Sequence, residues 1–313
     1  MINKAFKILN DRNFILISAI LLGFILGTRT TFLSKYSVWI LAMVMIFATS
    51  GFSFMEWRHV GKTFRIIGLS FLLNYVILGI LLIASGFLLF ENKIIITGII
   101  LLAISPPGPS VIPFTSALKG NISFAVTGVF GLNLIAIIVT PLSLLLFAGE
   151  SDINPQKVIS IILMVIVAPL IISRVLRRTP IMPAVEKVRG KVINWGFFFI
   201  ILPIVGMSKA LITNNPEIVL LSSLLFAVVM FGGGFLFNRI SEKSGMDKQT
   251  SIAASFMFTS KSSAFAAVIS FSLLPPESGL PLAINSVFLA LYFIIFNFLV
   301  NKKSKKELLK QII

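Results

Sequence analysis

Long apolar stretches alternate with short charged segments along most of this chain. A helix needs about 20 mostly apolar residues to cross the hydrocarbon layer of a bilayer, and a helix satisfies its own backbone where lipid cannot. The stretches that fit are 13–28, 36–55, 66–90, 94–118, 120–149, 158–173, 192–213, 218–238, 249–276 and 278–301. The pattern predicts an all-α polytopic membrane protein with ten transmembrane helices.

The composition supports this fold class and excludes several others. Hydrophobic residues make up 57% of the 313 residues and charged residues only 12%, whereas a soluble domain has about 25% charged residues. One soluble core could not bury this much apolar surface, so a water-soluble enzyme, a disordered chain and a fibrous protein are excluded. With no Cys and a single His, His59, we expect no disulfide, no metal site and no cofactor.

The net charge of +16 reports membrane orientation rather than nucleic-acid binding, because the cations lie between the apolar stretches. With both termini in the cytoplasm, inner segments hold 21 of the 27 Lys and Arg residues, outer segments hold 4, and Lys209 and Lys261 fall inside spans. Cytoplasmic segments of membrane proteins carry such an excess of cations. We therefore expect an integral protein of the plasma (cytoplasmic) membrane with cytoplasmic N- and C-termini, whose Lys-rich tail binds anionic lipid.

The predicted spans divide into two equal sets around the polar segment 150–157. Five spans in each half give the halves opposite orientations in the membrane, and such inverted repeats are common in transporters. We therefore expect a first repeat at 1–150 and a second at 151–313, which together form one transporter domain.

The fourth span of each half contains a polar interruption near mid-depth. In the first half it reads Ser-Pro-Pro-Gly-Pro-Ser at 105–110, and in the second half Thr-Ser-Lys-Ser-Ser at 259–263. Three prolines in four residues cannot belong to one continuous helix, and non-helical backbone at this depth persists only where it is buried in protein or lines a cavity. The second break is inferred from symmetry and polarity, because it holds no Pro or Gly. A binding cavity is the favoured interpretation, and a simple proline kink is the alternative.

Lys261 is a cation that the membrane does not favour. It lies about twelve or more residues from either end of its span, roughly 18 Å at 1.5 Å per residue, and a lysine at this depth costs at least ~2.5–3.5 kcal/mol on insertion scales. All eleven acidic residues lie in loops or tails, so no intramembrane carboxylate can pair with it. Three roles stay open: a neutral lysine, an ammonium that donates to carbonyls freed at the proline-rich break, or a cation that holds an anionic substrate. Lys209 lies near the outer end of its helix and can snorkel to the headgroups.

Other polar residues inside spans are interpreted as interhelical contacts or as parts of the site. Interhelical contact is favoured for Thr127, Asn285, Ser286 and Asn297, whereas Asn74 and Asn133 fit either role equally. The candidate substrate- or ion-binding residues are Asn74, Pro107, Gly108, Pro109, Ser110, Thr115, Asn133, Thr259, Ser260, Lys261, Ser262 and Ser263.

Two regions of the chain resemble a known family. One runs from Ser-Pro-Pro-Gly-Pro at 105–109 through Lys-Gly-Asn at 119–121 to Thr-Pro at 140–141, and the other from Asp-Lys-Gln-Thr at 247–250 to Lys-Ser-Ser-Ala-Phe-Ala at 261–266. With Leu-Asn-Tyr at 73–75 and Ala-Pro-Leu at 168–170, they resemble motifs of the bile acid:sodium symporter family, in the wider group of bile acid, arsenite, riboflavin and auxin-type carriers.

The resemblance implies an architecture and the place of the substrate. The third to fifth and eighth to tenth helices form a core, and the first, second, sixth and seventh form a panel. The fourth and ninth helices are broken and cross at mid-membrane, and substrate binds beside the crossing.

The chain departs from sodium-coupled members of the family at their sodium ligands. Their Ser-Asn pair falls here on Val111 and Ile112, their Glu on Met257, and their Gln or Arg on Lys261. The usual sodium oxygens are therefore largely missing. We hypothesise that the ammonium of Lys261 replaces the charge of a bound sodium ion, so that transport is sodium-independent, or proton-coupled where this lysine loses its proton.

The leading functional interpretation is a secondary active transporter of a small organic anion that works by alternating access. An efflux carrier of the auxin or arsenite type and a channel-like membrane protein are the alternatives. An enzyme is not expected, since adjacent residues such as Ser260 and Lys261 point about 100° apart on a helix and no intramembrane Asp, Glu or His offers acid–base chemistry. The expected partners are the anion and the bilayer, with no nucleic acid, and monomer and homodimer both stay open.

Overall fold

The computed structural model describes residues 12–51, 60–147 and 155–312, and every regular element in these ranges is helical. Eight helical segments in the described part are long and apolar enough to cross a membrane: Phe14–Ser50, Val60–Leu89, Ile122–Leu144, Gln156–Leu176, Met182–Asn214, Pro216–Lys243, Lys248–Leu273 and Pro276–Phe296. A shorter apolar helix covers Lys93–Ile104. The chain is thus an all-helical, polytopic integral membrane protein. By helix length and composition alone, the described part has eight candidate spans rather than the ten expected.

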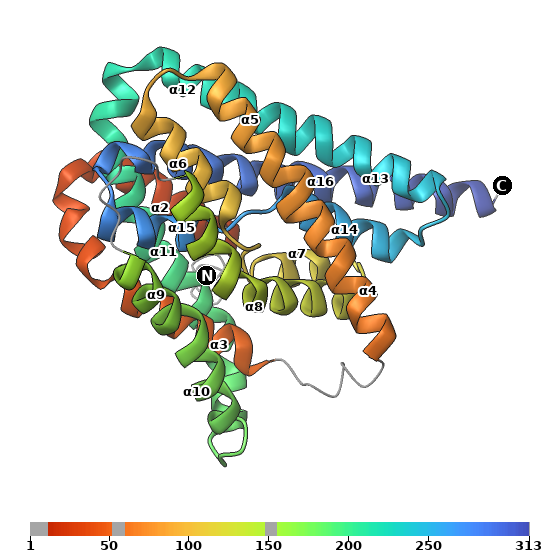
Figure 1. Cartoon of the computed structure of the whole chain (residues 1–313). Helices are drawn as coiled ribbons and strands as arrows, with labels where there is room; N and C mark the ends of the chain where they lie inside the picture. The colour runs from red at the N-terminus through yellow and green to blue at the C-terminus, as the bar shows by residue number, and fades with distance from the viewer. Residues whose placement is uncertain (1–11, 52–59, 148–154, 313) are drawn as a thin grey trace, which may run out of the picture.

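The helices are α2 (Arg12–Leu26), α3 (Ser37–Ser50), α4 (Val60–Phe71), α5 (Gly79–Leu89), α6 (Lys93–Ile104), α7 (Val111–Ala117), α8 (Ile122–Phe147), α9 (Pro155–Ile162), α10 (Ala168–Leu176), α11 (Met182–Asn214), α12 (Pro216–Ala227), α13 (Gly234–Lys243), α14 (Lys248–Thr259), α15 (Ser263–Leu273) and α16 (Gly279–Ile312). The 3₁₀ segments η1 (Gly27–Tyr36) and η6 (Pro276–Ser278) are short connections. The π-helical segments η3 (Leu72–Leu78), η4 (Leu163–Val167) and η5 (Val228–Gly233) join α4 to α5, α9 to α10 and α12 to α13. The α4–α5 and α12–α13 pairs form two long rods (Figure 1).

The first long segment, Phe14–Ser50, consists of two antiparallel arms. Gly27 has a φ of +58°, a left-handed conformation that suits glycine at a change of direction. The contacts of this segment with α11 are Gly23 with Leu202, Gly27 with Lys209, Thr30 with Gly206 and Val44 with Gly196. Along α2 the residue numbers of the contacted positions on α11 increase, so α2 runs parallel to α11. Along η1 and α3 these numbers decrease, so α3 runs antiparallel to α11.

Both polar interruptions are breaks in the helices that contain them. α6 ends at Ile104 and α7 begins at Val111, whereas α14 ends at Thr259 and α15 begins at Ser263. The second break lacks proline but carries a cap, because the Ser262 hydroxyl accepts a hydrogen bond of 3.2 Å from the backbone N–H of Phe265, which satisfies a free donor at the start of α15. The Ser262 N–H donates to the carbonyl oxygen of Pro106 at 3.0 Å, so the two breaks are in direct contact.

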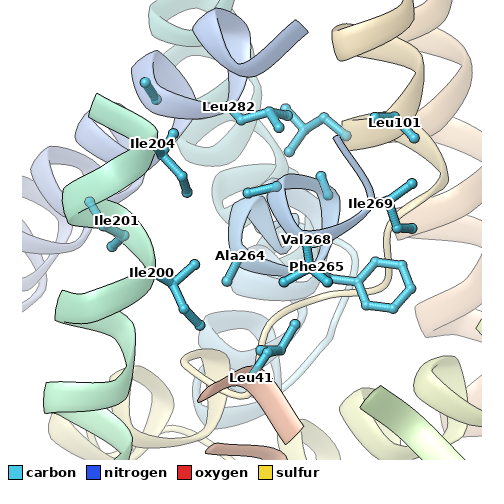
Figure 2. Close-up of a cluster of buried hydrophobic side chains, with 14 of the residues drawn as sticks. Leu41, Leu101, Ile200, Ile201, Ile204, Ala264, Phe265, Val268, Ile269 and Leu282 are labelled. Carbon is cyan, nitrogen blue, oxygen red and sulfur yellow. The ribbon is translucent and has the colours of Figure 1, made fainter. Parts of the chain in front are cut away.

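α15 lies in the middle of the larger apolar cluster. Figure 2 shows it between α11, which contributes Ile200 and Ile201, and α6, which contributes Leu101. The most apolar part of Lys248–Leu273 is entirely buried inside the protein. Other helices expose large apolar side chains, such as Leu88 and Ile138, on the outer surface. The break beside Lys261 is therefore shielded from lipid by protein on all sides.

The start of α14 is held by the turn that precedes α8. The backbone N–H of Asn121 donates to the Gln249 carbonyl at 2.8 Å, and the Asn121 side-chain amide donates to the Thr250 hydroxyl at 2.8 Å. Asp247 caps α14 by accepting a hydrogen bond of 2.9 Å from the Thr250 N–H. That N–H, together with the Thr250 hydroxyl, lowers the pKa of the Asp247 carboxyl below its ordinary value.

We expect Asp247→Ala to destabilise the folded protein by about 1 kcal/mol, the usual loss for an N-cap. Asp247→Asn keeps the acceptor oxygen and should cost only a few tenths of that. Because the folded-state pKa is lowered, the contribution of the carboxylate is present above the unfolded-state pKa of about 4 and is lost as pH falls through the folded-state value. Apparent melting temperatures of the purified variants in detergent, at pH 7 and under acid conditions, measure this. Equal melting temperatures for the Ala and Asn variants would contradict the capping role.

Candidate functional site

The ammonium of Lys261 lies between the two broken helices and is 1% exposed. Its Nζ donates to the carbonyl oxygen of Ala103 at 2.6 Å, to Oδ1 of Asn74 at 2.8 Å and to the carbonyl oxygen of Ser105 at 3.1 Å. The ring of Tyr75 lies beneath it, with its centroid 4.5 Å from Nζ. Ala103 and Ser105 are at the C-terminal end of α6, where the free carbonyls carry partial negative charge.

This geometry fits the charged form of Lys261. An ammonium has three N–H donors and no acceptor, and here each donor has one oxygen. A neutral amine would instead turn its lone pair toward one of those oxygens. All three partners are neutral, so they stabilise the positive charge by hydrogen bonding without cancelling it.

Asn74, in the π-helical segment η3, connects the lysine to the end of α14. Its Oδ1 accepts from Lys261, and its Nδ2 donates to the carbonyl oxygens of Met257 at 2.8 Å and Ser260 at 2.9 Å. One buried amide therefore satisfies the last carbonyls of α14 while Lys261 satisfies those of α6. The π-helical segment places Asn74 at this point, and such segments often occur at functional sites.

A cavity opens beside the contact between the two breaks. It is lined by Leu16, Gly108, Ser110, Phe114, Phe197, Ile201, Lys261, Ser262, Ser263, Ala264, Ser286, Leu289 and Ala290. The cavity has a volume of about 50 Å³, so it suits a small ligand. The lining residues come from α2, α7, α11, α15 and α16 and from the two breaks.

The structure brings together some of the predicted site residues and separates others. Five of them line the cavity: Gly108, Ser110, Lys261, Ser262 and Ser263. Asn74 and the Ser260 carbonyl belong to the hydrogen-bond network of Lys261.

The remaining candidates lie away from the cavity wall. Asn133 and Thr259 donate to the Val129 and Ser255 carbonyls of their own helices, at 2.7 Å and 2.9 Å. The Thr115 hydroxyl is buried with no hydrogen-bond partner in the described part of the chain. Pro107 and Pro109 are buried in the linker between α6 and α7.

Polar residues interpreted from the sequence as interhelical contacts have different outcomes. Asn285 links two helices, since its Nδ2 donates to the Ser263 hydroxyl at 2.7 Å. Ser286 bonds the Leu282 carbonyl of its own helix and lines the cavity. Lys209, which was expected from the sequence to snorkel to the headgroups, instead donates to the Ile25 carbonyl at 3.3 Å, and its Nζ lies 5.6 Å from the ring centroid of Phe24.

The sequence reasoning missed three kinds of residue at this site. The carbonyls of Ala103 and Ser105 belong to the backbone, which leaves no signal in the residue type. Phe197 and Ile201 are apolar residues in an apolar helix and look like any lipid-facing or core position. Tyr75 follows Asn74 directly, and its position in the same short motif is the signal that could have identified it.

A comparison with known proteins identifies the family of this chain. The sequence model of the sodium bile acid symporter family matches residues 38–215, which is more than half of the chain. The chain belongs to this family. The resemblance expected from the sequence motifs is thereby confirmed, and the family members are membrane transporters.

Individual relatives support the same assignment. The uncharacterized sodium-dependent transporter YocS of Bacillus subtilis is 26% identical over 272 residues, which cover 85% of this chain and 83% of YocS. Sodium/bile acid cotransporter 7 of Xenopus tropicalis and sodium/bile acid cotransporter 7-B of Xenopus laevis are each 41% identical over 75 residues, 23% of this chain and 22% of each relative.

Tyr75 should act on Lys261 through its ring rather than its hydroxyl, because that hydroxyl is buried without a partner in the described part of the chain. We expect Tyr75→Phe to leave stability unchanged or slightly raised. Tyr75→Leu should lose about 2 kcal/mol, since a desolvated cation–π contact is worth that much. Apparent melting temperatures in detergent compare the two variants, and an equal loss in both would show that the hydroxyl matters instead.

Proposed function

We propose that the protein is a secondary active transporter that carries a small organic anion across the plasma membrane by alternating access. The observation that carries the proposal is the place of Lys261, which is buried at mid-span, has three neutral hydrogen-bond acceptors and no anionic one, and lines a cavity. A buried positive charge surrounded only by neutral groups favours an anion in the adjoining space.

The proposed architecture has ten transmembrane helices in two inverted repeats, 1–150 and 151–313, with cytoplasmic termini. The two arms of Phe14–Ser50 supply two spans and the broken pair α6–α7 supplies another, so ten follow from the eight long segments. The breaks at 105–110 and 260–262 occupy the fourth span of each half, and the third spans both contain π-helical segments, η3 and η5. These correspondences support the internal repeat.

In this architecture α4–α8 and α12–α16 form the core, and α2, α3 and α9–α11 form the panel. The cavity has lining residues from both parts, including Ser110 and Ser262 from the core and Leu16 and Phe197 from the panel. A rocking motion of core against panel would therefore open the cavity first to one side of the membrane and then to the other.

We further propose that transport does not require sodium. The carbonyls at the end of α6 and the Asn74 amide already surround the ammonium of Lys261, and a sodium ion about 4 Å from it would be repelled by roughly 4 kcal/mol at an effective dielectric constant of about 20. The same three acceptors favour the protonated form of Lys261, so they disfavour a mechanism in which this lysine releases its proton during transport. For this reason the sodium dependence in the printed name of YocS is not carried over to this chain.

Flux into proteoliposomes tests both parts of the proposal. Radiolabelled pyruvate, pantoate and taurocholate are offered with sodium or with N-methyl-D-glucamine as the cation, at pH 6, 7 and 8. We expect saturable uptake of at least one anion, acceleration by the same unlabelled anion on the opposite side, and a rate that changes less than twofold with sodium or pH. Strict sodium dependence would refute sodium independence, and non-saturable flux without exchange would indicate a channel.

Substitution of the cation provides a second readout. Lys261→Met should lower saturable uptake at least tenfold, because the charge that attracts the anion is gone. Lys209→Met removes the other intramembrane lysine, whose ammonium caps the end of α2, and should keep most of the rate. Melting temperatures establish that both variants are folded, and wild-type flux in a folded Lys261→Met protein would contradict the role of the charge.

A further inference from the structure

The cavity has two chemically different walls. The linker before α7 supplies the hydroxyl of Ser110 on one wall, and the break before α15 and the first residue of α15 supply those of Ser262 and Ser263. On the other, α2 and α11 supply Leu16, Phe197 and Ile201. Figure 2 shows Ile201 on α11, the helix that lies beside the start of α15 at Ala264. A ligand that fills this cavity therefore meets both hydroxyl groups and hydrocarbon.

The hydroxyl hydrogens on the polar wall lack acceptors. The Ser262 hydroxyl accepts from the Phe265 N–H and the Ser263 hydroxyl accepts from Asn285, but neither donates to any group in the described part of the chain. Ser110, which is 8% exposed, makes no side-chain hydrogen bond there. A hydroxyl carries one donor hydrogen, so three O–H donors line the cavity with no hydrogen-bond acceptor assigned to them in the described part of the chain.

Gly108 lets two of these hydroxyls converge. A Cβ at position 108 would lie 3.3 Å from Oγ of Ser110 and 3.7 Å from Oγ of Ser262. The two serines come from the two halves of the chain, and the hydrogen atom of glycine leaves the space between them open. A group with several acceptor lone pairs, such as a carboxylate, can use more than one donor at this point.

We propose that the substrate is a short aliphatic monocarboxylate. Its carboxylate accepts hydrogen bonds from Ser110, Ser262 and Ser263 near Lys261, and its short hydrocarbon chain lies on Leu16, Phe197 and Ile201. The small volume of the cavity, about 50 Å³, favours a short chain over a long one. This inference rests on the proposed transport function and makes it specific, since an inorganic oxyanion leaves the apolar wall unused and a steroid acid exceeds the cavity.

Equilibrium binding to the full-length protein in detergent tests the substrate class without any transport step. The probes are acetate, propionate, butyrate, valerate, hexanoate and decanoate, with sulfate and taurocholate for comparison, measured by isothermal titration calorimetry. Affinity should rise about three- to fourfold for each added methylene up to valerate, the gain expected for burying one CH₂ group, and fall at decanoate. A flat profile, no binding by any acid, or tighter binding of sulfate or taurocholate than of valerate would overturn the inference.

Variants separate the two walls. Phe197→Ala enlarges the cavity at its apolar wall and should move the preferred chain length upward by one or two carbons while acetate affinity stays the same. Ser110→Ala and Ser262→Ala should each weaken every acid by about tenfold without changing the gain per methylene, because a hydrogen bond to a charged group is lost. Ser272→Ala is the matched control, since that hydroxyl bonds the Val268 carbonyl within α15 and is not among the cavity residues. Equal effects of the serine variants and the control would contradict the polar wall.

The binding series tests the ligand class and the flux assay tests the transport function, so either claim can be refuted without the other. Monocarboxylates that bind with the expected chain-length profile but are never transported would refute the transport function and leave the ligand class standing. Sodium-independent uptake of taurocholate without monocarboxylate binding would keep the transport function and reject the ligand class.

Discussion

The fold around the site depends on the hydrogen bonds of one buried ammonium. Inside a membrane protein, a lysine needs acceptors for all its donors and a broken helix needs donors for its free carbonyls. Lys261 and the end of α6 satisfy each other, and Asn74 extends the arrangement to the end of α14. The proline-rich break, the π-helical segment and the lysine are therefore interdependent, because removal of any one leaves buried polar groups of the others without partners.

The same physical solution recurs at other helix ends. Lys209 donates to the Ile25 carbonyl near the end of α2, and Arg174 and Arg177 donate to the carbonyls of Thr49 and Ser50 at the end of α3, at 2.8 Å and 2.9 Å. Cations are favourable at helix C-termini because the last carbonyls are unpaired and partially negative. In this protein basic side chains stabilise interrupted helices, so part of the cation excess serves the fold as well as the orientation.

The proposed role of Lys261 as a fixed cation would change what drives transport in a family named for its sodium coupling. A bound sodium ion travels with the substrate and contributes its own gradient, whereas a lysine side chain stays with the protein. In the proposed mechanism the driving force comes from the gradient of the substrate anion, from an anion exchanged for it, and from the membrane potential. The structural counterpart is a cavity lined by three serine hydroxyls beside a lysine whose Nζ already has three protein acceptors.

The sequence by itself determined the helical membrane class, the family motifs and the positions of both helix breaks, because prolines and a lysine at mid-span have large local energetic consequences. It also selected Asn74 and the serines around Lys261. Only the tertiary structure decided that the ammonium bonds the carbonyls of Ala103 and Ser105, that Asn133 and Thr259 bond within their own helices, and that Phe197 and Ile201 face the cavity. Backbone carbonyls have no signature in the residue type, and an apolar side chain looks the same in a sequence whether it faces lipid, core or substrate.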